Sequence, residues 1–247
     1  MKISFIIPFH NEEKNCILML KRVSEYADKT GLNYEIVPID DRSADKTTEL
    51  IKSFSEKNNC VFPLFRKIDS EEKGNTMGKS LIEATKKSKG DIIIWTMGDM
   101  ADDTKTYREI IEKIEKGYDM VFGSRYMPGG SRGNLDPFKA FFSSWGTMLA
   151  RVLFSVPVHD ITNAFRGFRR SVFDSITLTS SGFAISPEFA IKAHLSGFKL
   201  GEIPTVYTNR VEGVSSFKLF KMIRSYLSLF LNLFYQYKIR RIKYALS

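Results

Sequence analysis

The chain has 247 residues, of which 43% are hydrophobic, enough for one large α/β domain or two small ones with a sizeable core. Its formal net charge of +9 indicates a partner that carries phosphate groups: a nucleic acid, an anionic membrane or a phosphorylated substrate. The two cysteines, Cys16 and Cys60, lie far apart and near no histidine, which argues against a metal pattern or a disulfide framework and favours a reducing, cytoplasmic setting. The apolar runs are too short for a signal peptide or a membrane-spanning helix, so we expect neither.

Short apolar runs alternate with longer polar stretches over the first 125 residues. The runs predict strands and the polar stretches predict helices, an alternation typical of βαβ units and a mostly parallel sheet. The expected strands are 3–8, 34–39, 61–65, 91–95 and 118–122. The expected helices are 12–30, 45–58, 75–88 and 104–116.

The second half is less regular, and the glycine-rich stretch 129–133 separates it from the first. We expect helices at 138–154 and 188–196, a strand at 199–207 and a last helix at 217–244. Residues 225–237 carry no charge and have lysines and arginines on both sides. Two interpretations stay open: an amphipathic helix in the interface of an anionic membrane, or a helix packed on the domain or on a second subunit.

Aspartates follow the fourth expected strand. Asp99, Asp102 and Asp103 come directly after Gly98, which ends the region of this strand. Ligands of open α/β sheets bind beyond the carboxyl ends of the strands, and carboxylate oxygens there suit Mg²⁺ or Mn²⁺, which could hold a diphosphate. The alternative is a solvated acidic turn that caps the next helix.

Polar clusters also follow the first two expected strands, at 8–13 and 40–47. Acidic side chains in these clusters suit base amides, ribose hydroxyls or a cation, whereas Asn11 and Ser43 would serve equally as helix N-caps. The chain has neither a G-x-G-x-x-G motif nor a P-loop lysine motif, which disfavours a dinucleotide-binding protein and an NTPase.

Seven segments, taken together and in order, resemble the glycosyltransferase family 2 proteins of GT-A fold, and among these the polyprenyl-phosphate (dolichyl-phosphate) sugar synthases. The segments are FIIPFHNEE at 5–13, DDRSADKT at 40–47, NTMGKS at 75–80, GDMADD at 98–103, GSRYMPGG at 123–130, DITNAFRGFRR at 160–170 and NRVEGVSSFK at 209–218. The resemblance covers residues 3–218. It implies a GT-A domain at 1–217, an α/β fold with a mostly parallel sheet flanked by helices, and a basic amphipathic helix at 218–247. Within the domain, 1–125 would bind the nucleotide sugar and 126–217 the acceptor.

The resemblance also implies the residues of the donor site. They are Pro8, Glu12, Asp40 and Asp41, which would border the nucleotide, with Lys79 near it. Asp99 would contact the diphosphate and a divalent ion, Mg²⁺ or Mn²⁺. The usual motif is Asp-x-Asp, but its first position is Met97 here, so a second metal ligand would have to come from Asp102 or Asp103.

Basic residues of the second half point to the acceptor, because a guanidinium matches the oxygens of a phosphate. Those expected to bind it, together with one serine, are Arg125, Arg132, Arg166, Arg210, Ser215 and Lys218. From residue 209 to 243 the chain has eight lysines and arginines against one acid. This distribution favours a membrane surface over a nucleic acid, so we expect peripheral association with the inner face of the membrane and no nucleic-acid partner.

The predicted reaction is an inverting displacement in which Asp99, Arg125 and Arg210 are catalytic. The phosphate of a polyprenyl phosphate, already charged at neutral pH, would attack the sugar of a GDP- or UDP-sugar, and the nucleoside diphosphate would leave. A hydroxyl acceptor would instead need a base, for which Asp160 and Glu188 are candidates, although Asp160 is better interpreted as the partner of a nearby arginine. Two alternatives stay open: transfer to a glycan or glycolipid hydroxyl, and a GT-A domain that binds a nucleotide sugar without turnover.

Overall fold

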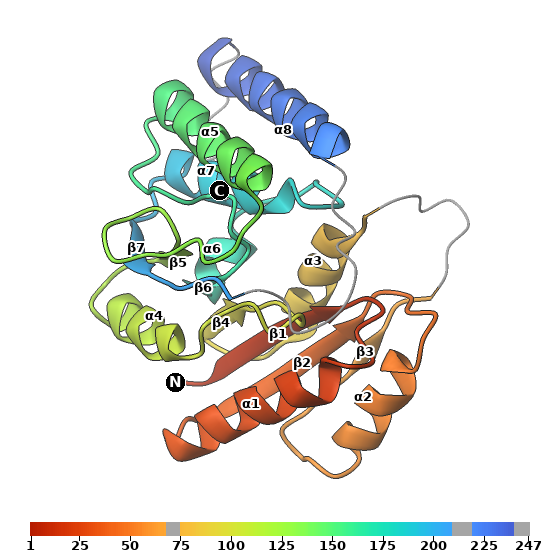
Figure 1. Ribbon diagram of the computed structural model, residues 1–247. Coiled ribbons are helices and arrows are strands. Elements are labelled where there is room, and N and C mark those ends of the chain that lie inside the picture. Colours follow the sequence, from red (N-terminus) through yellow and green to blue (C-terminus); the bar gives the residue numbers. More distant parts are fainter. Residues whose placement is uncertain (68–74, 209–218, 240–247) are drawn as a thin grey trace.

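The structure, a computed structural model, describes residues 1–67, 75–208 and 219–239. The strands of this part form one sheet in the order β3-β2-β1-β4-β6-β5-β7, in which β6 is antiparallel to both neighbours and all other pairs are parallel (Figure 1). The strands are β1 (Ile3–Phe9), β2 (Tyr34–Asp40), β3 (Leu64–Phe65), β4 (Ile92–Trp95), β5 (Met120–Ser124), β6 (Arg166–Arg169) and β7 (Leu200–Pro204). The predicted α/β class with a mostly parallel sheet is confirmed.

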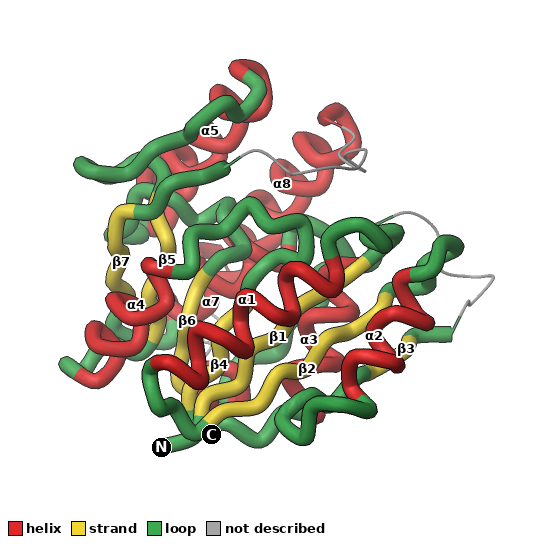
Figure 2. The backbone as a smooth tube through the Cα atoms, turned by 60° about the horizontal axis from the view of Figure 1, so that its bottom comes forward, coloured by secondary structure: helices red, strands yellow, loops and turns green. Residues whose placement is uncertain are grey.

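Side chains that alternate along the strands build one apolar layer on each face of the sheet. In β1, Phe5 and Ile7 belong to one layer and Ile6 to the other. The first layer is covered by α1 (Cys16–Lys29), α2 (Thr47–Ser55) and α4 (Lys105–Glu115). The second is covered by α3 (Met77–Lys87), α6 (Arg170–Asp174) and α7 (Ile185–Leu195), so that the sheet is enclosed between helices (Figure 2).

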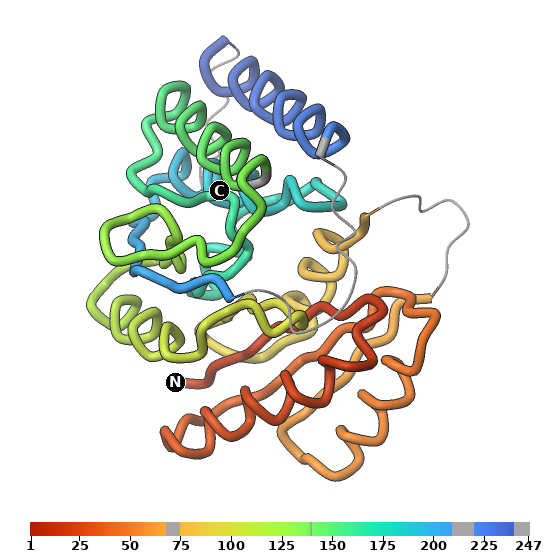
Figure 3. Tube along the Cα trace, in the orientation of Figure 1, coloured from red at the N-terminus to blue at the C-terminus, as the bar shows by residue number. Residues whose placement is uncertain are grey.

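Two long helices, α5 (Pro137–Phe154) and α8 (Leu219–Phe234), lie side by side outside the second layer (Figure 3). The rings of Phe154 and Phe230 meet edge to face with centroids 6.3 Å apart, and Tyr226 is buried in the same contact region. The end of α8 continues as a π-helical segment, η1 (Tyr235–Ile239). Within the described ranges, each helix is too short or too polar to cross a bilayer.

Several details differ from the sequence expectations. The first helix begins at Cys16, because residues 12–15 form a turn in which the amide of Asn15 bonds to the carbonyl of Glu12. The third strand is reduced to two residues. Both β6 and α6 were missed, and the predicted last helix extends on both sides beyond the residues that the structure describes.

Candidate functional site

The loops after β1, β2 and β4 meet at one edge of the sheet, since these strands are adjacent and parallel. Four non-glycine residues of the described part have a positive φ, and three of them lie in these loops: Asn11 (55°), Arg42 (62°) and Met100 (66°). A left-handed backbone is costly for residues other than glycine and concentrates at functional sites. This edge is therefore the candidate site.

The first two loops are joined by hydrogen bonds. The amide of Asn11 donates to Oγ of Ser43 at 2.9 Å, and the amide of Ala44 donates to Oδ1 of Asn11 at 2.7 Å. Asn11 and Ser43 therefore link two loops and do not cap helices, and that prediction is wrong. The N-cap positions are Asn15 and Lys46, and neither side chain makes a cap bond.

Asp40 ends β2 and Asp41 follows it, both as buried carboxylates. Asp40 accepts hydrogen bonds from the amide and hydroxyl of Ser43. Asp41 accepts from Thr76 at 2.6 Å and pairs with Arg66 at 2.8 Å. Burial raises the pKa of Asp41, but the hydrogen bond from Thr76 and the nearby arginines outweigh it, so the net pKa is lowered and the carboxylate stays charged.

The remaining residues predicted for the donor come to the same edge. A Cβ on Gly98 would lie 2.8 Å from the carbonyl oxygen of Pro8, so only glycine lets the loop that carries Asp99 approach the end of β1 this closely. In the loop between β1 and α1, Glu12 accepts a hydrogen bond from the side chain of Asn15 at 2.6 Å. Lys79 is exposed in the first turn of α3, a helix that the bond between Thr76 and Asp41 ties to the end of β2.

Asp99 and Asp102 form a buried pair of carboxylates, with exposed fractions of 8% and 6%. Oδ2 of Asp102 accepts from the amide of Met97 at 2.8 Å and from the hydroxyl of Thr96 at 3.0 Å. Burial and then the charge of Asp99 raise the pKa of Asp102 to about 7. A divalent cation would relieve this repulsion, so the pair fits Mg²⁺ or Mn²⁺.

The other possible ligand, Asp103, accepts from the amide of Lys105 at 3.0 Å at the start of α4. No group of three or more His, Cys, Asp or Glu side chains suited to a metal occurs in 1–67, 75–208 and 219–239. A cation at Asp99 and Asp102 would therefore need further oxygens from the diphosphate and from water, as is usual for Mg²⁺.

Arg125 follows β5 and is held rigidly by Asp160. Its Nε and Nη2 donate to the two carboxylate oxygens at 2.7 and 3.0 Å, and Nη2 also donates to Ser143 and Thr162. Nη1 makes no hydrogen bond to any residue of the described part, so two N–H groups are left for an anion. The charge of Arg125 also lowers the pKa of Asp102, so the two groups interact electrostatically. The interpretation of Asp160 as the partner of an arginine is confirmed.

Arg166, at the start of β6, is completely buried and does not face this anion position. Its guanidinium donates to the carbonyl oxygens of Ser186 at 2.9 Å and of Ile161 at 3.2 Å, and it lies over the ring of Phe122. Burial lowers its pKa to about 9. The structure therefore gives Arg166 a structural role, in contrast to the expected acceptor contact. Of the other expected acceptor residues, Arg132 is an exposed residue of a loop, and Arg210, Ser215 and Lys218 lie outside the described residues.

Glu188, a candidate base, is fully buried, and its carboxylate is occupied by an ion pair and hydrogen bonds. It pairs with Lys192 at 2.5 Å and accepts hydrogen bonds from the amides of Thr179 and Ser180. Burial raises its pKa, but the bond from Lys192 and the other donors bring the net pKa below the usual value. Ser143 and Thr162, which accept hydrogen bonds from Arg125, were not predicted from the sequence. The one available signal was the position of Thr162, two residues after Asp160 in a matched segment.

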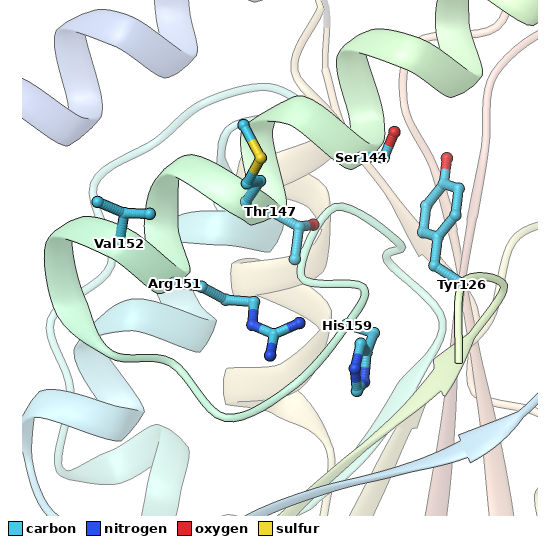
Figure 4. A pocket seen from close by; sticks show the side chains of 7 residues that line it. Tyr126, Ser144, Thr147, Arg151, Val152 and His159 are labelled. Atoms are coloured by element: carbon cyan, nitrogen blue, oxygen red, sulfur yellow. The ribbon is translucent and has the colours of Figure 1, made fainter. Parts of the chain in front are cut away.

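A pocket with a volume of about 440 Å³ lies on the side of α5. Figure 4 shows Arg151 of α5 directed toward His159, with Tyr126 at the edge. Met148 and Val152 supply the apolar part of its lining. None of the residues predicted for the donor lines this pocket, but Tyr126 links it to Arg125, whose guanidinium lies over the ring of Tyr126.

Sequence comparison identifies relatives over most of the chain. The family model described as glycosyl transferase family 2 matches residues 4–177. A dolichol-phosphate mannosyltransferase of Pyrococcus furiosus is 32% identical over 88% of this chain and 60% of its own length. A polyprenol monophosphomannose synthase of Mycolicibacterium smegmatis is 25% identical over 85% of this chain and 78% of its own length. The chain thus spans only about 60% of the first of these relatives.

Solved structures share the fold at low sequence identity. Glucosyl-3-phosphoglycerate synthase of Mycobacterium tuberculosis, crystallised with Mn²⁺, UDP and glucosyl-3-phosphoglycerate, superposes with a TM-score of 0.68 at 15% identity, over 94% of this chain and 79% of that one. TarS of S. aureus, crystallised with UDP-GlcNAc, gives a TM-score of 0.63 at 17% identity, over 93% of this chain and 65% of that one. At these identities the likeness concerns the fold alone.

Proposed function

The chain belongs to glycosyl transferase family 2, and from that membership we propose that it transfers a sugar from a nucleotide sugar to the phosphate of a polyprenyl phosphate at a membrane surface. The GT-A fold that the resemblance implied is confirmed. The observation that carries the proposal is the arrangement of Arg125. Asp160 holds its guanidinium while Nη1 keeps its two N–H groups for an anion, and its charge acts on Asp102 of the donor edge. Both relatives are named for transfer to a polyprenol or dolichol phosphate.

In this proposal the donor lies along the ends of β1, β2 and β4. Asp40 and Asp41, with Pro8 and Glu12, border the base and ribose, and Lys79 approaches from the start of α3. Asp99 and Asp102 are the residues that would hold a divalent ion next to the diphosphate. Bound there, Mg²⁺ or Mn²⁺ would supply the positive charge that a leaving nucleoside diphosphate needs.

The acceptor phosphate lies against Arg125, with Arg132, Arg210, Ser215 and Lys218 proposed as further contacts. A phosphate monoester loses its second proton near pH 6, so it attacks the anomeric carbon without a strong base, in a single inverting displacement. Arg125 positions the nucleophile, and its rigid pairing with Asp160 keeps the guanidinium in place.

The carboxylates that a hydroxyl acceptor would need as a base are already engaged. Asp160 is paired with Arg125 and Glu188 with Lys192, and both carboxylates are fully buried. Lys192 and the other donors lower the pKa of Glu188, which makes it a poor base, and both oxygens of Asp160 accept hydrogen bonds from Arg125. This favours a phosphate acceptor over the hydroxyl of a glycan.

An exposed apolar face on α5 and α8 supports action at a membrane. The exposed side chains on α5 include Phe138, Phe141, Met148 and Val152, and those on α8 and η1 include Phe220, Leu227, Leu231, Tyr235 and Ile239. Lys221, Arg224 and Lys238 are exposed along the same segment. Apolar side chains bordered by cations suit the interface of an anionic bilayer, so we propose peripheral association with the inner face of the membrane.

The function is tested by offering two acceptors in parallel. The protein is incubated with labelled GDP- or UDP-sugars and Mg²⁺ or Mn²⁺, with either polyprenyl phosphate in anionic vesicles or a glycan. Label in a lipid-extractable product that mild acid cleaves supports the proposal. Label in the glycan alone would overturn it, and donor binding without transfer or hydrolysis would indicate a binding protein.

A further inference from the structure

Tyr226 of α8 is a polar side chain that the donor and acceptor assignments leave without a role. It is only 5% exposed. Its hydroxyl makes no hydrogen bond to any residue within 1–67, 75–208 and 219–239. The residue is largely covered, but its hydroxyl oxygen is not fully enclosed, so a ligand can still reach it.

The ring of Tyr226 lies against the residues that hold Arg125. A Cβ on Gly146 would be 3.4 Å from Cδ2 of Tyr226 and 3.7 Å from Cγ2 of Thr162, so the tyrosine, α5 and Thr162 converge at this glycine. Thr162 in turn accepts a hydrogen bond from Nη2 of Arg125 at 3.1 Å. Tyr226 therefore belongs to the same cluster as the arginine.

The charged groups that act on the phenol of Tyr226 are Arg125, Asp160 and Arg166. Burial raises the pKa of Tyr226 well above its usual value, although Arg125 and Arg166 lower it and Asp160 raises it. The hydroxyl thus keeps its proton across the physiological range and can donate a hydrogen bond to an anion. Ser143 and Thr162, the other hydroxyls beside Arg125, already bond to each other and to the guanidinium.

Building on the proposed function, we propose that the hydroxyl of Tyr226 donates a hydrogen bond to the acceptor phosphate that Nη1 of Arg125 holds. Two unused donors, one charged and one neutral, would then bind one phosphate monoester. Helix α8 would complete the acceptor site, because its buried face supplies Tyr226.

This assignment joins two properties in one helix. Tyr226 and Phe230 face the domain, whereas the neighbouring Leu227 and Leu231 are exposed on the face proposed to meet the membrane. The segment that would contact the bilayer thus also contacts the phosphate of a lipid lying in it.

The test replaces Tyr226 by Phe, which keeps the ring and removes only the hydroxyl. The acceptor is a water-soluble short-chain isoprenyl phosphate, so that membrane binding does not enter. We expect KM for this acceptor to rise about 10- to 100-fold, the cost of losing a hydrogen bond to a charged group, while KM for the donor and the melting temperature stay unchanged. The matched control is Tyr237→Phe near the end of the same helical segment, which should leave all three unchanged.

A second measurement does not depend on a variant. Wild-type protein with ¹³C-labelled tyrosine is titrated with the isoprenyl phosphate and with the corresponding isoprenyl alcohol. The resonance of one buried tyrosine should shift with the phosphate and not with the alcohol, whereas a packing role predicts no difference between the two.

The outcomes separate this inference from the proposed function. If the wild type transfers no sugar to any isoprenyl phosphate, the function itself is wrong. If the wild type transfers and Tyr226→Phe keeps the wild-type acceptor KM, the inference is overturned while the function stands. An equal rise of donor and acceptor KM would also overturn it.

Discussion

Asp99 lies between the end of β1 and the buried Asp102, where a charge on the donor's diphosphate would be held. Replacing Asp99 by Asn removes the negative charge but keeps an oxygen that can accept from the amide of Ala101. We therefore expect transfer to fall by about 100-fold or more, while the unfolding free energy hardly changes. Initial rates with saturating Mg²⁺ or Mn²⁺, together with thermal melts, measure both quantities.

The matched control for Asp99 is Asp103→Asn in the same loop, at the start of α4. Its carboxylate bonds to the amide of Lys105, so the control should change stability slightly and turnover little. Removal of divalent ions with EDTA should lower the wild-type rate and leave the residual rate of the Asp99 variant unchanged. Normal turnover of that variant would remove Asp99 from the mechanism.

Asp102 should make stability depend on pH. Its folded pKa, about 7, lies above the usual 3.8, so the folded protein binds more protons than the unfolded chain between these values. The stability that this proton provides is fully present below pH 4 and is lost as the pH rises through 7. Asp102→Asn keeps an acceptor for Met97 and Thr96 without the charge, so its advantage over the wild type should grow between pH 4 and 7, to at most about 4 kcal/mol.

Urea unfolding in EDTA at pH 5 and pH 8 measures this difference for Asp102. An advantage of the variant that is equal at both values, or larger at pH 5, would contradict the raised pKa. Chelation matters because a bound cation would favour the charged carboxylate in the wild type.

Arg125 should affect the acceptor more than the donor. Arg125→Ala would leave the buried Asp160 unpaired, which costs about 3–5 kcal/mol and endangers folding. Arg125→Lys keeps the charge but loses the two-pronged contact, so it is the variant to measure. We expect a higher KM for polyprenyl phosphate with unchanged binding of a nucleoside diphosphate, whereas equal losses in both would indicate a structural arginine.

The sequence predicted the position of a site residue where that residue directly follows an apolar strand, and it failed where the direction of the side chain depends on strand pairing. Asp99 and Asp40 follow apolar runs that end at a predictable edge of the sheet, so their place could be anticipated. Arg166 looked equivalent to Arg125 because both lie in matched segments, but only pairing with β4 and β5 shows that its side chain points into the interior. Tyr226 gave no signal beyond the apolar pattern of its helix.

At the scale of elements, local pattern predicted every parallel strand and failed for the antiparallel one. The four residues of β6 read Arg-Gly-Phe-Arg, which is no apolar run, and they become a strand only because β4 and β5 present open edges on both sides. The reversal matters for the site, since the loop before β6 then reaches the edge where β4 and β5 end. Asp160 and Thr162 meet Arg125 for this reason.

The hydrogen bonds that join the loops after β1 and β2 should contribute to stability and to donor binding. The hydroxyl of Ser43 accepts from the amide of Asn11 and donates to Asp40, so Ser43→Ala leaves both partners without it. We expect a loss of about 1–2 kcal/mol in unfolding free energy and weaker binding of nucleoside diphosphates. The same change at Ser55, whose hydroxyl bonds only to a helix carbonyl, should alter neither; unchanged binding in the Ser43 variant would detach this link from the donor site.

At the scale of the whole molecule, the donor edge is formed by the loops after β1, β2 and β4, Arg125 follows β5, and the apolar face lies on α5 and α8, further along the chain. The buried contact between α5 and α8 connects this face to the acceptor cluster through Tyr226. A lipid phosphate that enters from the membrane would thus meet Arg125 before it meets the donor. The arrangement explains why one domain would carry both an acidic strand edge and a basic, apolar helix.

The membrane face is best tested by substitution, because deletion of 219–247 would also remove the buried Tyr226 and Phe230. Phe220 and Leu231 are 87% and 70% exposed, so changing both to Ser leaves the contact of α8 with α5 intact. We expect the double variant to lose co-sedimentation with anionic vesicles while it still transfers sugar to a water-soluble isoprenyl phosphate.

The control changes Leu18 and Phe62, which are 49% and 51% exposed on the first half of the chain, and should bind vesicles like the wild type. High salt should weaken wild-type binding if Lys221 and Arg224 contribute, and undiminished sedimentation of the double variant would show that α8 does not meet the bilayer.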